Sequence, residues 1–373
     1  MAEPLINQYG ESIPRQIAAQ ISSVYERFNA EQFVDDALKG YHSLDLMARG
    51  RHIAEALHHH LPADYEEATR LLVASMGSRL ERDEGSSMAP FLYLPHSFYI
   101  ARYGLEHFEA SMQAQYELTQ RFTAEFCIRP YLEQHTETTL ERLHLWAEDN
   151  NHHVRRLVSE GTRPRLPWAS CLKEFQKDPA PVLALLEKLK DDPELYVRRS
   201  VANNLNDIGK DHPELLTSTT RRWLDQASPE RLWLIRHALR SMIKQGQSEA
   251  LDQLGYGKAP EVQISQPDIT PAQVCMGGKV QLSFELLNPT SVSQDLLIDF
   301  CVHYIKGNGS TSAKVFKLKT LQLAANTSEK LSKSLSLANM TTRRHYPGVH
   351  QVDLLINGCS YPLGHFELSF AAQ

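Results

Sequence analysis

The chain has 373 residues, of which 42% are hydrophobic, so it is long enough for about two domains with a core each. Its formal charge of −6 argues against a protein that is basic throughout, as many nucleic-acid-binding domains are, so any basic surface must be local. No apolar run approaches the roughly 20 residues that cross a bilayer, and the first residues lack the pattern of an export signal, which predicts a cytoplasmic protein without a membrane partner.

Residues 1–257 follow the three- and four-residue spacing of amphipathic helices. Ala54, Leu57 and Leu61 recur on one helix face, and the same spacing continues from Ala68 onward. An acidic start at Asp64 separates these two segments. The short connections predict helices that pack as antiparallel pairs.

A repeat is visible within this helical region. The segment 148–156 is echoed by 191–199 and more faintly by 228–236, so that Val154, Val197 and Ile235 recur at a spacing of roughly 40 residues. That period is typical of a two-helix HEAT unit. We therefore predict an all-α solenoid of HEAT-like repeats over residues 1–257.

The segment 154–168 contains a carboxylate in an unfavourable place. Gly161 ends the helix that begins before Val154, and Pro164 prevents a restart. Glu160 therefore lies in the last turn, where the helix dipole repels an acid by a few tenths to about 1 kcal/mol. Asp207 lies in the same place in the next repeat. Desolvation in a shared groove is expected to raise their pKa values and make one a potential base. The alternative is a structural ion pair with a nearby arginine.

Two further residues are candidates for a site, each with a structural alternative. Trp168 follows a rigid Arg-Leu-Pro segment that can display its indole to a cationic ligand, although a tryptophan in such a connection can also fill a core gap. Glu125 lies between Phe122 and Phe126 in a segment predicted as an apolar helix, where it can serve the site or bond to Arg129.

Arginines follow the repeat position and suggest a surface for phosphates. Arg236, Arg240 and Lys244 are spaced four residues apart, which predicts a basic ridge along one helix that could follow a phosphate backbone. In the alternative interpretation, arginines of the ladder pair with acids of the neighbouring repeat. The arginines directly after the repeat valines are Arg155, Arg156, Arg198 and Arg199.

Residues 258–373 change to the two-residue alternation of β-strands. Val280, Leu282 and Phe284 alternate with polar residues, and a later alternating segment ends in Asn357-Gly358, a favoured hairpin turn. Short antiparallel strands over this length predict an all-β immunoglobulin-like sandwich. The Cys…Trp…Cys pattern of antibody domains is absent from this part of the sequence.

No metal or cofactor is predicted. Adjacent helical histidines at 58–60 and 152–153 point in different directions, and no carboxylate or cysteine set completes a ligand group around them. The five cysteines are not in CxxC pairs, which argues against a disulfide framework and a zinc site. The sequence also lacks a P-loop and a dinucleotide fingerprint.

The segments 121–130 and 154–168, joined to HEAT-like repeats, resemble the bacterial AlkC family of DNA alkylation repair glycosylases, in the subgroup with a C-terminal immunoglobulin-like domain. The resemblance implies a monofunctional glycosylase of base excision repair that removes cationic N-alkylated bases, notably 3-methyladenine and 3-methylcytosine, from double-stranded DNA. It implies that the repeats hold bent DNA on a concave surface, that the β domain helps grip the duplex, and that the lesion is reached without full base flipping. The protein would associate with the nucleoid when bound to DNA.

Carried over from the family, the active-site group is Glu125, Glu160, Asp207 and Trp168, with Arg156 and Arg163 beside it. We expect Glu160 and Asp207 to orient the attacking water and to stabilise the sugar cation, and Glu125 to set their ionisation. The residues expected to contact DNA are Arg155, Arg156, Arg163, Arg198, Arg199, Arg236, Arg240, Lys244, Arg343 and Arg344.

Two other functions remain open from the sequence. A non-catalytic HEAT-repeat adaptor that binds a protein partner fits the acidic total charge, but it does not account for two acids at helix ends. A protein that binds alkylated DNA without turnover keeps the ligand and loses the reaction. For each interpretation we expect a monomer.

Overall fold

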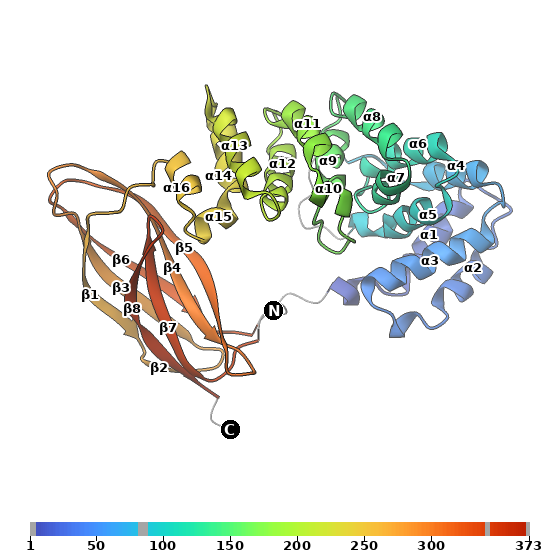
Figure 1. The fold of residues 1–373 in the computed structure, drawn as a ribbon. Coiled ribbons are helices and arrows are strands. Elements are labelled where there is room, and N and C mark those ends of the chain that lie inside the picture. The colour runs from blue at the N-terminus through green and yellow to red at the C-terminus, as the bar shows by residue number, and fades with distance from the viewer. Residues whose placement is uncertain (1–4, 81–88, 340–343, 371–373) are drawn as a thin grey trace. The chain divides into compact units, whose positions relative to one another are not determined.

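The computed structural model describes residues 5–80, 89–339 and 344–370, and the contacts divide the chain into two compact units, Met1–Ala238 and Leu239–Gln373. Helices form the first unit, and two β-sheets form most of the second (Figure 1). The predicted order of an all-α region followed by an immunoglobulin-like β region is confirmed.

The three- and four-residue spacing in the first unit corresponds to helices. They are α1 (Ser12–Ser22), α2 (Ala30–Leu38), α3 (Leu46–His60), α4 (Tyr65–Ser75), α5 (Leu94–Tyr103), α6 (Phe108–Thr119), α7 (Ile128–Gln134), α8 (Thr136–Trp146), α9 (His152–Gly161), α10 (Lys173–Lys177), α11 (Ala180–Leu189), α12 (Leu195–Ile208), α13 (Pro213–Leu224) and α14 (Pro229–Ala238), with 3-10 helices at Leu5–Gln8, Tyr41–Ser43 and Ala89–Tyr93. Asp64 caps α4 by accepting a hydrogen bond from the Glu67 amide at 2.8 Å.

The repeat in the sequence corresponds to a row of packed helices. α12 packs against both α9 and α14, while α11 packs against α8, α9 and α12 (Figure 1). Val154, Val197 and Ile235 are each fully buried on α9, α12 and α14. Equivalent residues therefore form the core between repeats, as the period predicts.

The predicted basic ridge on one continuous helix is wrong. α14 ends at Ala238, and a turn at the fully buried Leu239 separates it from α15 (Arg240–Lys244). The break also falls at the division between the two compact units. No glycine or proline marks this turn, so the spacing of the basic residues could not reveal it.

The position where helices give way to strands differs from the boundary between the two compact units. The last helix, α16 (Ser248–Gln253), ends before the expected boundary at 257/258, whereas the packing divides at 238/239. The reason is that α15 and α16 belong to the second unit: Leu251 of α16 lies against Gly358, where a Cβ atom would come within 2.6 Å of its Cδ1.

Two sheets form the second unit. One has the order β1-β3-β6 and the other β2-β8-β7-β4-β5, and all neighbours are antiparallel except β2 and β8. The strands are β1 (Gln263–Thr270), β2 (Gln273–Cys275), β3 (Lys279–Leu287), β4 (Gln294–Ile305), β5 (Thr311–Leu323), β6 (Ser328–Ser336), β7 (Gly348–Ile356) and β8 (Cys359–Ser369).

The predicted alternation is confirmed in this sandwich. Val280, Leu282 and Phe284 of β3 are buried in its core. Asn357 and Gly358 join β7 to β8 with φ angles of 47° and 78°, which are the left-handed values that a two-residue hairpin turn requires.

Candidate active site

The carboxylates of Glu160 and Asp207 meet at a single arginine. Glu160 lies in the last turn of α9 and Asp207 in the last turn of α12, and these two helices pack together. Arg163 donates from Nη1 to Glu160 Oε1 at 2.7 Å and from Nε to Asp207 Oδ2 at 2.8 Å. All three residues are buried. The two acids that break the dipole rule thus belong to one cluster.

A second arginine extends the cluster to Glu125. Arg156 donates to Glu125 Oε2 at 2.5 Å and to Thr123 Oγ1 at 3.0 Å, and its Nη2 lies 3.5 Å from Glu160 Oε1. The sequence placed Glu125 on an apolar helix and offered Arg129 as its structural partner. Both expectations are wrong, because Glu125 lies in a turn between α6 and α7 and is bonded to Arg156.

The result is an alternating series of acids and bases, which we call the charge chain: Glu125, Arg156, Glu160, Arg163, Asp207 and Lys210. Its last member, Lys210, donates to Asp207 Oδ1 at 2.8 Å. The side chain of Lys210 is 46% exposed, whereas that of Asp207 is 2% exposed. An exposed lysine holds its partner weakly. The contact from Lys210 therefore holds Asp207 less firmly than the buried contact from Arg163.

Glu160 is ionised in this environment, contrary to the raised pKa expected from the sequence. Burial acts to raise the pKa of Glu160, but the charges of Arg156 and Arg163 and a hydrogen bond from Ser200 outweigh it, so the pKa is lowered. In the reverse direction, the acids of the charge chain raise the pKa values of Arg156 and Arg163 despite their burial. A carboxylate that stays ionised can stabilise a positive charge or orient water, but it cannot serve as a proton donor at neutral pH.

The sequence analysis missed Ser200 as a member of this site. Its hydroxyl donates to Glu160 Oε2 at 2.6 Å, so each carboxylate oxygen of Glu160 has a donor. Ser200 precedes Asp207 by two helical turns and lies on the same face of α12. The helical spacing between Ser200 and Asp207 could have indicated in the sequence that Ser200 lies near the acid pair.

Trp168 is displayed on the surface. Trp168 is 63% exposed. Its backbone φ of 65° lies in the left-handed region, which residues with large side chains rarely adopt. The alternative that this indole fills a core gap is therefore wrong. It stands on the connection 162–172 between α9 and α10, which also carries Arg163.

Four of the arginines predicted to contact DNA are bonded within the protein: Arg156 and Arg163 in the charge chain, and Arg155 and Arg198 outside it. Arg155 forms two bonds with the buried carboxylate of Asp192, at 2.5 and 3.0 Å, and also donates to two backbone carbonyls. Its repeat counterpart Arg198 is buried and donates to the carbonyls of Asp192 and Pro193. The guanidinium groups of Arg155 and Arg198 are therefore engaged within the protein, and the interpretation that arginines pair with acids of the neighbouring repeat fits Arg155, whereas Arg198 bonds to backbone carbonyls of its own repeat.

Other predicted DNA contacts are more accessible. Arg199 of α12 and Arg236 of α14 are exposed on neighbouring helices of the first unit. In the second unit, Arg240 is half-buried, Lys244 is exposed near the buried carboxyl of Asp299, and the guanidinium of Arg344 lies 5.8 Å from the centre of the Tyr346 ring. Arg343 lies outside the described residues.

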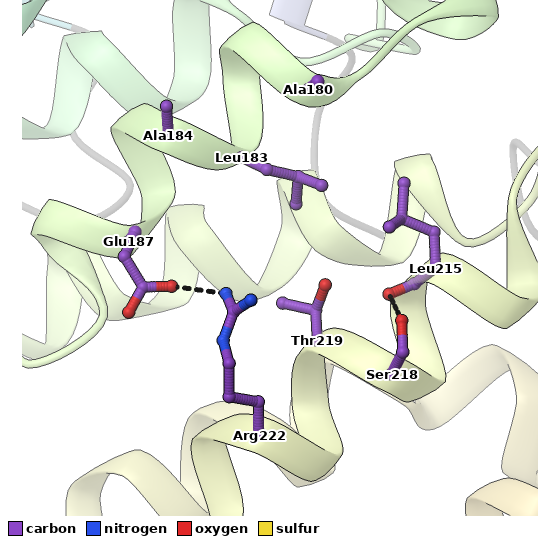
Figure 2. A pocket seen from close by; sticks show the side chains of 8 residues that line it. All are labelled: Ala180, Leu183, Ala184, Glu187, Leu215, Ser218, Thr219 and Arg222. Atoms are coloured by element: carbon purple, nitrogen blue, oxygen red, sulfur yellow. Dashed lines mark hydrogen bonds and ion pairs between the residues drawn. The ribbon is translucent and has the colours of Figure 1, made fainter.

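A large pocket elsewhere in the first unit is separate from the charge chain. It measures about 550 Å³ and lies between α11 and α13, where Leu183, Ala184 and Leu215 line it and Arg222 donates to Glu187 at 2.7 Å (Figure 2). None of the predicted catalytic residues lines it. The charge chain instead lies at the ends of α9 and α12, beside the connection that displays Trp168.

Within the described ranges, no group of three or more His, Cys, Asp or Glu side chains is arranged to hold a metal ion. No helix in the same ranges has the length and apolar character of a bilayer-spanning segment.

Comparison with known proteins places the chain in a class. Residues 119–242 match the model of the DNA alkylation repair enzyme family, and residues 263–370 match that of the C-terminal Ig-like domain of YhaZ. The first match spans the whole charge chain. The fold and the site thus define a DNA alkylation repair enzyme with an immunoglobulin-like domain.

Two relatives match nearly the whole chain. The uncharacterized protein YhaZ of Bacillus subtilis is 36% identical over 94% of this chain and 95% of its own length. The structure of the alkylpurine DNA glycosylase AlkC of Pseudomonas fluorescens, bound to DNA containing an abasic site analog, has 39% identity and a TM-score of 0.92, and the match covers 98% of this chain and 100% of AlkC. The chain belongs to the AlkC family and is a DNA repair glycosylase. The adaptor interpretation is therefore set aside.

Proposed function

We propose that this glycosylase hydrolyses the N-glycosidic bond of cationic N-alkylated bases in double-stranded DNA, with 3-methyladenine and 3-methylcytosine as substrates, and leaves an abasic site. The observation that carries the proposal is the pair of buried carboxylates, Glu160 and Asp207, held by Arg163, which lies on the same connection as the exposed Trp168.

The charge state of the acids fits a cationic substrate. An alkylated base that already carries a positive charge leaves without a proton, so the enzyme needs no general acid. As the bond breaks, positive charge moves to the sugar, and fixed negative charges nearby stabilise that transition state. The lowered pKa of Glu160 keeps it ionised for this role. One carboxylate oxygen of Asp207 is bonded to the exposed Lys210, which a substrate can displace. We therefore propose that Asp207 stabilises the sugar cation and orients the attacking water, and that Glu160 supports it with a second negative charge.

Glu125 acts through Arg156 and not on the substrate directly. It pairs with that arginine at 2.5 Å, and Arg156 in turn lies 3.5 Å from Glu160, which accepts its shorter bond from Arg163 at 2.7 Å. The expected influence of Glu125 on the ionisation of Glu160 and Asp207 is thus proposed to act through Arg156.

Trp168 provides selectivity for the charged base. The electron-rich indole attracts a cation by about 0.5 to 2 kcal/mol, and a neutral base gains no such energy. Because Trp168 is displayed on a surface connection, the lesion can be reached from the backbone side without full rotation into a pocket. The exposed Arg199 and Arg236 would hold the phosphates of the bent duplex, and Arg344 of the second unit would add to the grip. We further propose that the protein acts as a cytoplasmic monomer.

Methylated duplex DNA tests the proposal. The protein is incubated with duplexes that contain 3-methyladenine or 3-methylcytosine, and released base and abasic sites are quantified together. Stoichiometric release of base with appearance of abasic sites is expected. Binding without release of base would make the protein a sensor of alkylated DNA. A protein that neither bound the duplex nor released base would overturn the proposal.

A further inference from the structure

One buried arginine outside the charge chain binds both ends of the connection 162–172. Arg129 of α7 donates from Nη1 to the carbonyl oxygens of Gly161 and Arg163, at 3.1 and 2.9 Å, and from Nη2 to that of Ser170 at 2.5 Å. The residue is 2% exposed. Its three acceptors lie on either side of Trp168 in the sequence.

We propose that Arg129 is a positioning residue for catalysis, which fixes the connection that carries Arg163 and Trp168 against the end of α9. This inference rests on the proposed function, because the two residues it positions are those assigned to the acid pair and the cationic base. Arg129 itself contacts neither acid.

The geometry requires an arginine. A planar guanidinium offers five donors in a fixed fork and can bind three carbonyl oxygens from two directions, whereas a lysine ammonium is a compact point charge on a flexible stem. Burial lowers the pKa of Arg129 to about 10, so the group stays charged at neutral pH.

The positive charge also suits its place at the end of α9. Gly161 is the last residue of that helix, and its carbonyl is at the negative end of the helix dipole. A cation bonded there offsets the unfavourable position of the neighbouring Glu160. Arg129 thereby supplies a local compensation for the acid that the sequence placed against the dipole.

Close packing makes the contact possible. A Cβ atom at Gly161 would lie 2.6 Å from Cγ2 of Ile128, the residue before Arg129. Only a residue without a side chain lets α7 approach the end of α9 this closely. The same pair of motifs, 121–130 and 154–168, that marks the family in the sequence therefore meets at this contact.

The alternative is that Arg129 contributes to stability alone. Arg49 provides a matched control, because it is also buried and also donates to backbone carbonyls, those of Ile6, Tyr9, Tyr41, His42 and Leu44, at 2.8 to 3.4 Å. It lies in α3 and has no bond to the connection 162–172. Arg49→Lys therefore perturbs a similar carbonyl cluster remote in sequence from the site.

The experiment compares Arg129→Lys and Arg49→Lys in the full chain at a temperature where circular dichroism shows both folded. Hydrogen exchange measured by mass spectrometry reports the mobility of residues 162–172, and single-turnover release of 3-methyladenine reports catalysis. Arg129→Lys is expected to speed exchange in that connection and to lower the release rate about 10- to 100-fold, as a small misplacement of catalytic groups does. Affinity for undamaged duplex should change less than about threefold, and Arg49→Lys should affect neither readout of the site.

A double-mutant cycle separates positioning from stability. In a Trp168→Ala background, Arg129→Lys should cost less than in the wild type, because the part of its effect that acts through Trp168 is already lost, whereas the part that acts through Arg163 remains. Additive losses, unchanged exchange, or faster exchange with a normal release rate would each overturn the proposal.

The test still gives an answer if Arg129→Lys does not fold or if the wild type releases no base. If Arg129→Lys does not fold, Arg129→Gln, which lacks the charge but keeps an amide donor, is measured in the same way. If the wild type releases no base, the proposed function fails, whereas the exchange measurement still decides whether Arg129 holds the connection.

Discussion

Replacing Glu160 with glutamine is the most informative single change at the acid pair. The substitution keeps the shape of the side chain and removes one negative charge from the middle of the charge chain. Glu160 accepts bonds from Arg163 and Ser200, at 2.7 and 2.6 Å, and an amide can keep only one of these in an unchanged geometry. The variant also leaves Arg156 and Arg163 with two carboxylate partners in place of three.

Two magnitudes follow from this geometry. Breaking a buried ion pair by removing one partner costs about 3 to 5 kcal/mol of stability, and the lower value applies because Arg163 keeps its bond to Asp207. The loss of one preorganised electrostatic group from a transition state lowers the rate about 100- to 1000-fold. We therefore expect a folded but less stable protein whose release rate falls by that factor while its affinity for duplex DNA is nearly unchanged.

The assay is single-turnover release of 3-methyladenine with excess enzyme, combined with thermal unfolding. Asp192→Asn is the matched control, because Asp192 is also a buried acid paired with an arginine, Arg155, at 2.5 Å. It should lose stability and keep its release rate at a temperature where it is folded. A Glu160→Gln protein that released base at the wild-type rate would refute the reasoning.

Three further predictions concern selectivity, DNA binding and pH. Trp168→Ala should lower release of cationic bases by about 3- to 30-fold, the equivalent of a lost cation–π contact, with little change for a neutral alkylated base; equal losses for both would contradict selection by charge. Arg199→Gln and Arg236→Gln should each reduce the slope of log affinity against log salt by about 0.9, whereas Arg155→Gln should lower the melting temperature without changing that slope. Because the pKa of Glu160 is lowered, its contribution to stability is fully present above the ordinary glutamate pKa and is lost as the pH falls through the lowered value. Release rates should accordingly be flat between pH 5 and 8, and an acid limb within that range that Glu160→Gln abolishes would contradict the lowered pKa.

The sequence predicted the fold well, because periodicity and turns are local signals. The spacing of Val154, Val197 and Ile235 reported the repeat core, and Asn357-Gly358 reported the hairpin. The break at Leu239 was not predictable, since no glycine or proline marks it and the spacing of the basic residues continues across it.

The site was only partly predictable for a similar reason. The sequence predicts that Glu160 and Asp207 lie at helix ends, because the residues that end a helix are close to them in the chain. The direction of the pKa shift of Glu160 was not, because it depends on how closely Arg156 and Arg163 approach the acid in space. The same limit explains Arg155 and Arg198, which look like DNA contacts in the sequence but are committed to Asp192 and to backbone carbonyls.

If the acid pair stabilises a positive charge on the sugar, the protein should bind a positively charged sugar analogue more tightly than a neutral one. The measurement is the ratio of Kd values for two duplexes, one with a neutral tetrahydrofuran at the abasic position and one with a cationic pyrrolidine of the same shape. Tighter binding of the cation is expected, because it resembles the transition state. The wild type should prefer it by about 10-fold or more, and the preference should vanish in the Glu160→Gln, Asp207→Asn double variant. Equal affinity of the wild type for the two duplexes would contradict the account.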